Sequence, residues 1–418
     1  MRLAPGTPLN LALAFDPAKP PIPAGRVAID RGIAQLEWSQ DVLAARLRVG
    51  GLYYPPEPGL QPARGRAFDG LHGFLADSLP EGWGRRLIRR RLEKLGVDLA
   101  TLSPLDHLAL VGCHGRGALI YEPALTPAED VATLDLDALA AESAAILAGE
   151  EGTLANTLAD LAGGSGGARP KVHVGFNAKG EVSIGEGELP AGFNPWIVKF
   201  RAPQDPDDIG PIEEAYAQMA EAAGLVMSEH RLIPAQAGPG YFATKRFDRT
   251  SGGGRLHMVS FAGAVEAPTE PGIVSYDTFL RATQAITRRQ PDVEAAFRRM
   301  VFNILACNRD DHTRQHVYLM DAGGDWRLAP AYDLTYAPGP GGEHYLDIEG
   351  EGRNPTLAHV LRLGARHNLD AKRVSAMVEE VRDAVAKWQT LSMAAGVSTA
   401  SVKQIKGEHQ RVWETFKA

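Results

Sequence analysis

One stretch of the chain, residues 303–336, restricts its possible folds most strongly, because charged groups and short rigid elements alternate there. It begins as an apolar helical run, passes through a polar cluster at 308–312, and continues as two short strands around a Gly-Gly turn. The first strand is expected at 317–320, and the second is expected to end at Asp333. Asp310 and Asp333 therefore lie before and after a hairpin. Such a hairpin can hold a base near a metal ligand, which indicates the catalytic centre of a phosphotransferase.

Composition sets the limits within which that centre must be built. The chain has 418 residues, which is enough for two or three domains. A net charge of −7 argues against direct coating of nucleic acid, so a DNA contact is expected to go through a partner. Two cysteines provide neither a disulfide framework nor a zinc site. The N-terminus lacks a signal-peptide pattern, and no run approaches the about 20 apolar residues of a membrane helix. We therefore expect a cytoplasmic protein.

The first predicted domain, residues 1–125, is rich in short strands. Residues 9–15 alternate between apolar and polar, and 27–38 has the pattern of a hairpin. Residues 73–95 have a helical period and carry a basic run, which predicts either a solvated helix face or a surface that docks a partner or a phosphate. The arginines of this run are Arg85, Arg86, Arg89, Arg90 and Arg91.

In the second predicted domain, residues 126–250, a helical region is followed by a glycine-rich stretch that leads to Lys171 and a strand. Glycines such as Gly166 and Gly167 let backbone N–H groups approach phosphate oxygens, and lysine adds positive charge. The stretch lacks the GK[ST]-helix pattern of a Walker A loop, and a flexible linker would have the same composition. The glycines alone therefore do not distinguish a phosphate-binding loop from a linker, and the neighbouring elements must decide.

A strand, a helix and two further strands come after this loop. The strand at 195–200 carries Lys199 among apolar neighbours, like the strand lysine that kinases place on ATP phosphates. Glu213 and Glu214 lie in the first turn of the next helix, where they could pair with Lys199 or only favour the helix dipole. Residues 245–247, with Lys245 and Phe247 at their ends, lie where an adenine hinge is expected. This order predicts a nucleotide-binding small lobe.

The third predicted domain, residues 251–418, is mostly helical. Helices are expected at 276–287, 291–307, 356–368, 370–390 and 398–416. Between them, the kinase pattern D-x-x-x-x-N places Asp310 at the position of the base and Gln315 at the position of the metal-binding asparagine. Asp333 takes the position of a second Mg²⁺ ligand. A metal site on His312 and His316 is the competing interpretation, but the strand expected next would separate the two rings.

Taken together, these motifs resemble the HipA toxin kinases. The resemblance implies an α+β fold, distantly like the phosphoinositide 3/4-kinases, with a small β-rich N-terminal subdomain, an ATP-binding lobe and an all-α C-terminal lobe. The matching pieces, in family order, are LADSLPEGWGRRL (75–87), SPLDHLALVGCHGRGAL (103–119), GGARPK (166–171), IVKF (197–200), KRFDR (245–249), RLHM (255–258), CNRDDHTRQH (307–316) and APAYDL (329–334).

The resemblance also implies roles for single residues. It makes Asp310 the catalytic aspartate and Asp333 a Mg²⁺ ligand, and it assigns Lys199 to the ATP phosphates. Lys245 and Phe247 would form the hinge. Asp311 and His312 are expected only to support the loop.

At two functional positions the chain departs from the family pattern. Gln315 stands where the family has asparagine, and its extra methylene displaces the amide oxygen. Gly164 stands where the family carries an autophosphorylated serine, and the nearest serine is Ser165.

Two functions are expected. The resemblance implies a serine/threonine protein kinase that uses ATP and Mg²⁺, modifies a protein such as an aminoacyl-tRNA synthetase, arrests growth, and is neutralised by a HipB-like helix-turn-helix antitoxin. The second, motivated by Gln315 and Gly164, is a catalytically weak nucleotide-binding scaffold or corepressor that acts through a DNA-binding partner.

Overall fold

The computed structural model describes seven ranges of the chain, and Gly164 and Ser165 lie outside them. The described residues are 2–4, 6–65, 68–125, 135–150, 158–159, 166–184 and 189–417.

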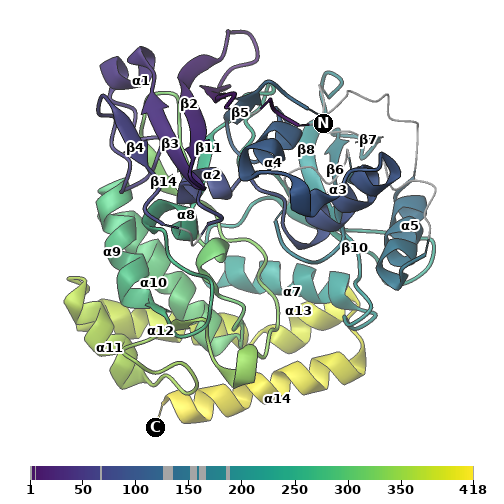
Figure 1. Ribbon diagram of the computed structural model, residues 1–418. Coiled ribbons are helices and arrows are strands. Elements are labelled where there is room, and N and C mark those ends of the chain that lie inside the picture. The colour runs from purple at the N-terminus through teal and green to yellow at the C-terminus, as the bar shows by residue number, and fades with distance from the viewer. Residues whose placement is uncertain are drawn as a thin grey trace.

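An antiparallel sheet forms the N-terminal part, in the order β4-β3-β2-β1-β5 (Figure 1). Its first three strands confirm the predicted strand and hairpin. Apolar side chains alternate along β3 and face the core, as expected for a sheet with one buried face. The strands are β1 Leu9–Leu13, β2 Ile22–Asp30, β3 Ile33–Trp38, β4 Leu60–Pro62 and β5 Leu119–Glu122, with α1 Gln40–Ala45 after β3.

The helix predicted over 73–95 is wrong as a single element. It is two helices, α2 Gly73–Ala76 and α3 Gly82–Lys94, because Pro80 lacks an N–H group and disfavours helical backbone just before it. Between them, the buried Asp77 accepts hydrogen bonds from the backbone N–H and the hydroxyl of Ser260, at 2.6 Å each. After a short turn (η1 Leu99–Thr101), α4 Pro104–Val111 begins with a capping box.

A second antiparallel sheet comes next, in the order β7-β6-β8-β10-β9. Two side chains of α3, Trp83 and Leu87, belong to the core of this sheet. The N-terminal part therefore contributes one helix to the nucleotide-lobe core. The elements are α5 Leu136–Ala148, β6 Lys171–Phe176, β7 Val182–Ile184, β8 Asn194–Lys199, α7 Ile209–Ala222, β9 His230–Ile233 and β10 Tyr241–Lys245.

The C-terminal part is mainly helical, and Figure 1 shows α14 running along one edge of the molecule, with α7 between the second sheet and these helices. The predicted helices are present, except that 370–390 is divided between α12 and α13. The helices are α8 Phe261–Val265, α9 Tyr276–Thr287, α10 Gln290–Leu305, α11 Leu357–Arg366, α12 Ala371–Val385, α13 Trp388–Ala395 and α14 Thr399–Phe416.

The prediction that this part is all-α is wrong, because the part also contains short paired strands. A three-stranded sheet has the order β11-β13-β14, and two more strands pair in parallel. The predicted hairpin is present, but its second strand ends at Leu328, so Asp333 lies in the loop beyond it. The elements are β11 His257–Ser260, β12 Val274–Ser275, β13 Val317–Met320, β14 Trp326–Leu328, β15 Leu346–Asp347, η2 Thr313–Gln315 and η3 Pro340–Gly342.

One hydrophobic core joins the N-terminal sheet, α7 and the C-terminal helices, and a second core lies under the second sheet. The loops that carry the predicted site residues therefore lie between these two hydrophobic cores. Within the described ranges, no helix has the length and apolar character needed to span a membrane.

Candidate nucleotide and acceptor site

A cleft lies between the second sheet and the segments around the β13–β14 hairpin. Eight of the predicted site residues line the cleft, which are Gly166, Gly167, Lys171, Lys199, Lys245, Phe247, Gln315 and Asp333.

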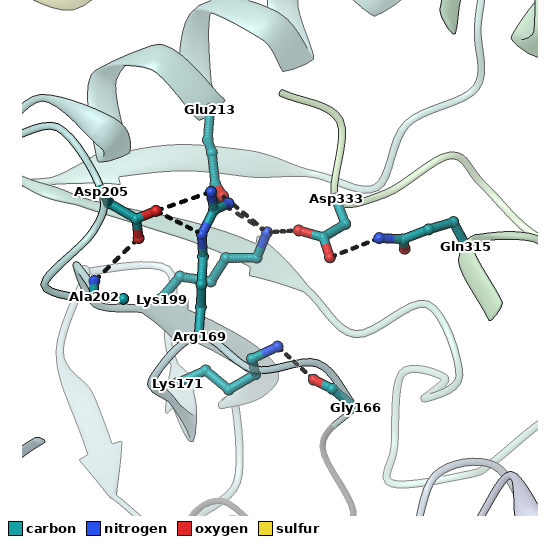
Figure 2. A network of polar contacts seen from close by, with 9 residues as sticks. All are labelled: Gly166, Arg169, Lys171, Lys199, Ala202, Asp205, Glu213, Gln315 and Asp333. Atoms are coloured by element: carbon teal, nitrogen blue, oxygen red, sulfur yellow. Dashed lines mark hydrogen bonds and ion pairs between the residues drawn. The ribbon is translucent and has the colours of Figure 1, made fainter. Parts of the chain in front are cut away.

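At one wall of the cleft, Lys199 is held between two carboxylates (Figure 2). Its Nζ lies 3.2 Å from Glu213 Oε2, on α7, and 2.5 Å from Asp333 Oδ1. Burial alone would lower the pKa of Lys199, but the two carboxylates outweigh it and raise the pKa above its ordinary value. The ammonium group is therefore a fixed positive charge facing the cleft.

The structure decides between the two glutamates near the start of α7. Glu214 accepts a hydrogen bond from Gln218 at 2.7 Å and contacts His230 at 2.9 Å, so it points away from Lys199. Glu213 is the partner of the strand lysine, as the kinase pattern predicts.

Asp333 lies in the strongest electrostatic field of the site. Burial would raise its pKa, but Lys199 and Lys171 outweigh burial and hold the pKa of Asp333 well below its usual range. Its backbone has φ +55°, a left-handed conformation that is uncommon outside glycine and that turns the chain sharply here. The carboxylate is therefore ionised at neutral and mildly acidic pH.

Asp333 and Gln315 are the residues here that could hold Mg²⁺. Gln315 Nε2 donates to Asp333 Oδ2 at 3.2 Å, so the amide would have to turn to present its oxygen, because Mg²⁺ takes oxygen ligands. Mg²⁺ in nucleotide sites is held by one or two carboxylates plus phosphates and water. No cluster of three or more histidine, cysteine or acidic side chains occurs among the residues that the structure describes, so no complete protein cage is present there.

The glycine-rich loop is tied to the cleft by Lys171. Its Nζ donates to the Gly166 carbonyl oxygen at 2.5 Å. Burial lowers the pKa of Lys171 to about 8, although Asp333 opposes the shift. An anionic phosphate in the cleft would stabilise the charged form of this lysine.

The predicted hinge forms an aromatic edge of the cleft. The rings of Phe247 and Tyr332 pack 5.4 Å apart. Within the described part of the chain, no partner is present for the Phe247 backbone N–H, which leaves a donor beside the cleft. Lys245 also lines the cleft, and its Nζ lies 3.3 Å from Glu229 Oε2.

Asp310 does not line this cleft. It lines an adjacent hollow together with Arg169, Pro338 and Tyr345, and Asp333 lines both spaces. The Asp310 side chain is 47% exposed, and its Oδ1 lies 3.9 Å from His312 Nε2. Burial, together with the Asp333 carboxylate, raises the pKa of Asp310 above its ordinary value, although His312 opposes the shift.

The neighbours of Asp310 support the loop, as predicted. Asp311 is buried and accepts hydrogen bonds from Tyr276 at 2.7 Å and from the Tyr345 backbone at 2.8 Å. His312 accepts from the Arg314 backbone at 3.2 Å and caps η2. His316 stacks on Phe279 in the core, so the competing two-histidine metal site is not formed.

Sequence reasoning missed one central residue, Arg169. Its NH2 lies 3.0 Å from Asp205 Oδ1, and its NH1 lies 3.1 Å from Glu213 Oε1. Figure 2 shows the resulting chain of contacts from Asp205 through Arg169, Glu213 and Lys199 to Asp333. An arginine among the small residues of GGARPK could have marked this position as functional. The sequence does not show, however, that its partners are Asp205 and Glu213.

Two family models match the chain. The HipA N-terminal domain matches residues 21–122, and the HipA-like C-terminal domain matches residues 163–388, more than half of the chain. The predicted domain boundaries near 125 and 250 stay predictions. No curated protein matches the sequence.

Among solved structures, the chain is similar to HipA of the toxin–antitoxin system of Shewanella oneidensis MR-1, described in complex with HipB and operator DNA. The match covers 98% of this chain and 97% of that chain, with a TM-score of 0.71 and 16% identity, so the two share a fold. This confirms the predicted α+β fold class. The proinflammatory kinase CtkA of Helicobacter pylori covers 56% of this chain and 94% of its own at 12% identity, with a TM-score of 0.33, too low to indicate a common fold.

Proposed function

The chain belongs to the HipA family, and we propose that it is a serine/threonine protein kinase that uses ATP and acts as the toxin of a toxin–antitoxin pair. One observation carries the proposal. Lys199 is held by Glu213 and Asp333 at the wall of the cleft, and Asp310 faces a second space that shares Asp333 with the cleft. A site with two entrances suits transfer of a phosphoryl group between two substrates.

On the cleft side, the residues bind and orient ATP. Phe247 and Tyr332 offer an aromatic surface for the adenine, and the free N–H of Phe247 offers a hydrogen bond to its edge. Lys199 and Lys171 bring positive charge to the phosphates. Glu213 holds Lys199 in place, so little reorganisation is needed when charge develops in the transition state.

On the acceptor side, Asp310 takes the role of base. A serine or threonine hydroxyl that enters the hollow would donate its proton to the Asp310 carboxylate as its oxygen bonds to the γ-phosphorus and the bond from that phosphorus to the leaving ADP breaks. Burial raises the pKa of Asp310, which brings its proton affinity closer to the working pH and makes it a better base.

Asp333 and Gln315 are the residues that would hold Mg²⁺. A bound Mg²⁺ would neutralise charge on the ATP phosphates. In the structure Gln315 presents its amide nitrogen to Asp333, so its amide must turn to offer the oxygen. That turn requires no movement of the backbone.

The proposal includes partners. Because the similar Shewanella protein is described with HipB and operator DNA, we infer that a HipB-like helix-turn-helix antitoxin neutralises this chain and carries it to DNA. The net charge of −7 is consistent with indirect contact. The protein substrate would be one whose modification stops growth, such as an aminoacyl-tRNA synthetase.

The test compares phosphoproteins in a host that expresses either the natural chain or Asp310→Ala, together with ATP consumption by the two purified proteins. We expect phosphorylation and ATP turnover only with the natural chain, at equal folded stability. Equal turnover by both proteins would contradict the proposal. ATP binding without transfer, with transfer restored by Gln315→Asn, would instead establish the catalytically weak scaffold.

A further inference from the structure

The start of α3, which belongs to the N-terminal part, is bound directly to the end of the glycine-rich loop. Trp83 donates its backbone N–H to the Gly167 carbonyl at 3.1 Å and its indole N–H to the Lys171 carbonyl at 3.1 Å. In return, Glu81 Oε2 accepts the Gly167 N–H at 3.1 Å. Three hydrogen bonds thus fix the loop on a segment far from it in sequence.

Close backbone approach is built into this contact. Gly82 has φ +23°, and a Cβ at this position would lie 2.6 Å from Ala168 Cα. Only glycine allows the two chains to come this close. The contact is therefore specific to this pair of segments.

The same carboxylate also holds the catalytic loop. Glu81 Oε1 forms an ion pair with Arg314, and both side chains are largely buried, with 24% and 21% exposed. Arg314 directly precedes Gln315, and its carbonyl oxygen accepts a hydrogen bond from Tyr332 at 2.6 Å. Glu81 and Arg314 both line the nucleotide cleft. One side chain therefore links three segments of the site.

We propose that Glu81 is a positioning residue through which the N-terminal part sets the shape of the nucleotide cleft. Its carboxylate holds the Gly167 N–H and the Arg314 guanidinium in one arrangement, so that the glycine-rich loop and the residues before Gln315 keep a fixed separation. The contacts of Glu81 with Gly167 and Arg314 are seen in the structure. The effect of these contacts on ATP binding rests on the proposed kinase function.

The first test measures hydrogen exchange over residues 166–171 in the full-length chain without nucleotide. Glu81→Ala should speed exchange at Gly167 about tenfold, the effect of losing a hydrogen bond to a charged group. Glu81→Gln keeps a hydrogen-bond acceptor, so its exchange rate at Gly167 should lie between those of the natural chain and Glu81→Ala. Glu93→Ala, an exposed position on the same helix, should leave exchange unchanged. Unchanged exchange in Glu81→Ala would overturn the proposal, and thermal unfolding of each variant shows whether it is folded.

The second test separates positioning from catalysis. We expect Glu81→Ala to raise the KM for ATP about tenfold with a much smaller change in kcat, and Glu81→Gln to recover part of the loss. The opposite result, tighter ATP binding by Glu81→Ala, would show that the Glu81 carboxylate keeps the Gly167 N–H and Arg314 from binding the ATP phosphates. That result would contradict the proposed positioning role of Glu81. If the natural chain binds no ATP, the kinase function fails, whereas the exchange experiment still decides whether Glu81 holds the loop.

Discussion

The cleft side and the acceptor side of the site differ most in the environments of their two aspartates. Asp333, on the cleft side, is surrounded by cations that hold its pKa well below the ordinary value. Asp310, on the acceptor side, is half-exposed, and burial with a neighbouring carboxylate raises its pKa. Carboxyl groups whose environments push their pKa values apart have different tasks. Under the proposed function, this difference suits a permanent charge on the cleft side and a proton acceptor on the acceptor side.

The largest effect is expected for Asp333→Asn. The change removes the partner of Lys199 and the carboxylate that we propose binds Mg²⁺, so phosphoryl transfer should fall about 10³-fold or more. The lowered pKa means that Asp333 stabilises the folded protein above its unfolded pKa, and that this stabilisation is lost as the pH falls through the folded value. At neutral pH we therefore expect a loss of about 2–3 kcal/mol in the free energy of unfolding, less than for a fully buried pair because a quarter of the side chain is exposed. Urea unfolding without nucleotide measures this loss.

Asp310→Asn should have the opposite effect on stability and a smaller effect on rate. Transfer should fall about 10²–10³-fold while ATP affinity is kept, because a general base acts only in the chemical step. A raised pKa stabilises the folded protein below the unfolded pKa, and this contribution is lost as the pH rises. The ionised carboxylate is thus a cost at neutral pH, and the amide should unfold at a slightly higher temperature.

The pH dependence of the same variant checks the role of Asp310. In the natural chain kcat/KM should fall on the acid side as Asp310 takes up a proton, at a pH above the ordinary aspartate value of about 3.9. The residual activity of Asp310→Asn should lack this fall. An unchanged acid limb in Asp310→Asn would assign the titration to another group and remove the contrast between the two aspartates.

Local patterns in the sequence predicted the elements that carry the site. The strand at 317–320 and the helix at 276–287 are found with the predicted bounds, because apolar periodicity and Ser or glycine signals act over short distances. The order of loop, strand and helix offered Glu213 and Glu214 as partners of Lys199 but left a helix-dipole role open, and the structure shows Glu213 as the partner. Asp333 was misplaced because β14 pairs with β13 only as far as Leu328, and the next segment instead bonds to Val226 through the Ala331 N–H.

Contacts between distant segments could not be predicted in this way. Glu81 pairs with Arg314, and Arg169 pairs with Asp205, although the partners are distant from each other in the sequence. No periodic pattern joins such pairs, and charged residues in loops are usually solvated. The two missed residues, Glu81 and Arg169, are both held by partners from distant segments, which is where sequence reasoning has least to use.

The smallest effect is expected for Arg169→Lys. Whether this change alters kcat or the KM for ATP shows whether Arg169 acts on the acceptor side or on the cleft side. A lysine keeps the charge but cannot contact Asp205 and Glu213 through a planar fork, so the geometry between them is lost. Because Arg169 lines the hollow with Asp310, we expect kcat to fall about tenfold with little change in the KM for ATP. Arg382→Lys, which alters an exposed pair, is the matched control. A rise in the KM for ATP with an unchanged kcat would instead show that Arg169 acts on the cleft side.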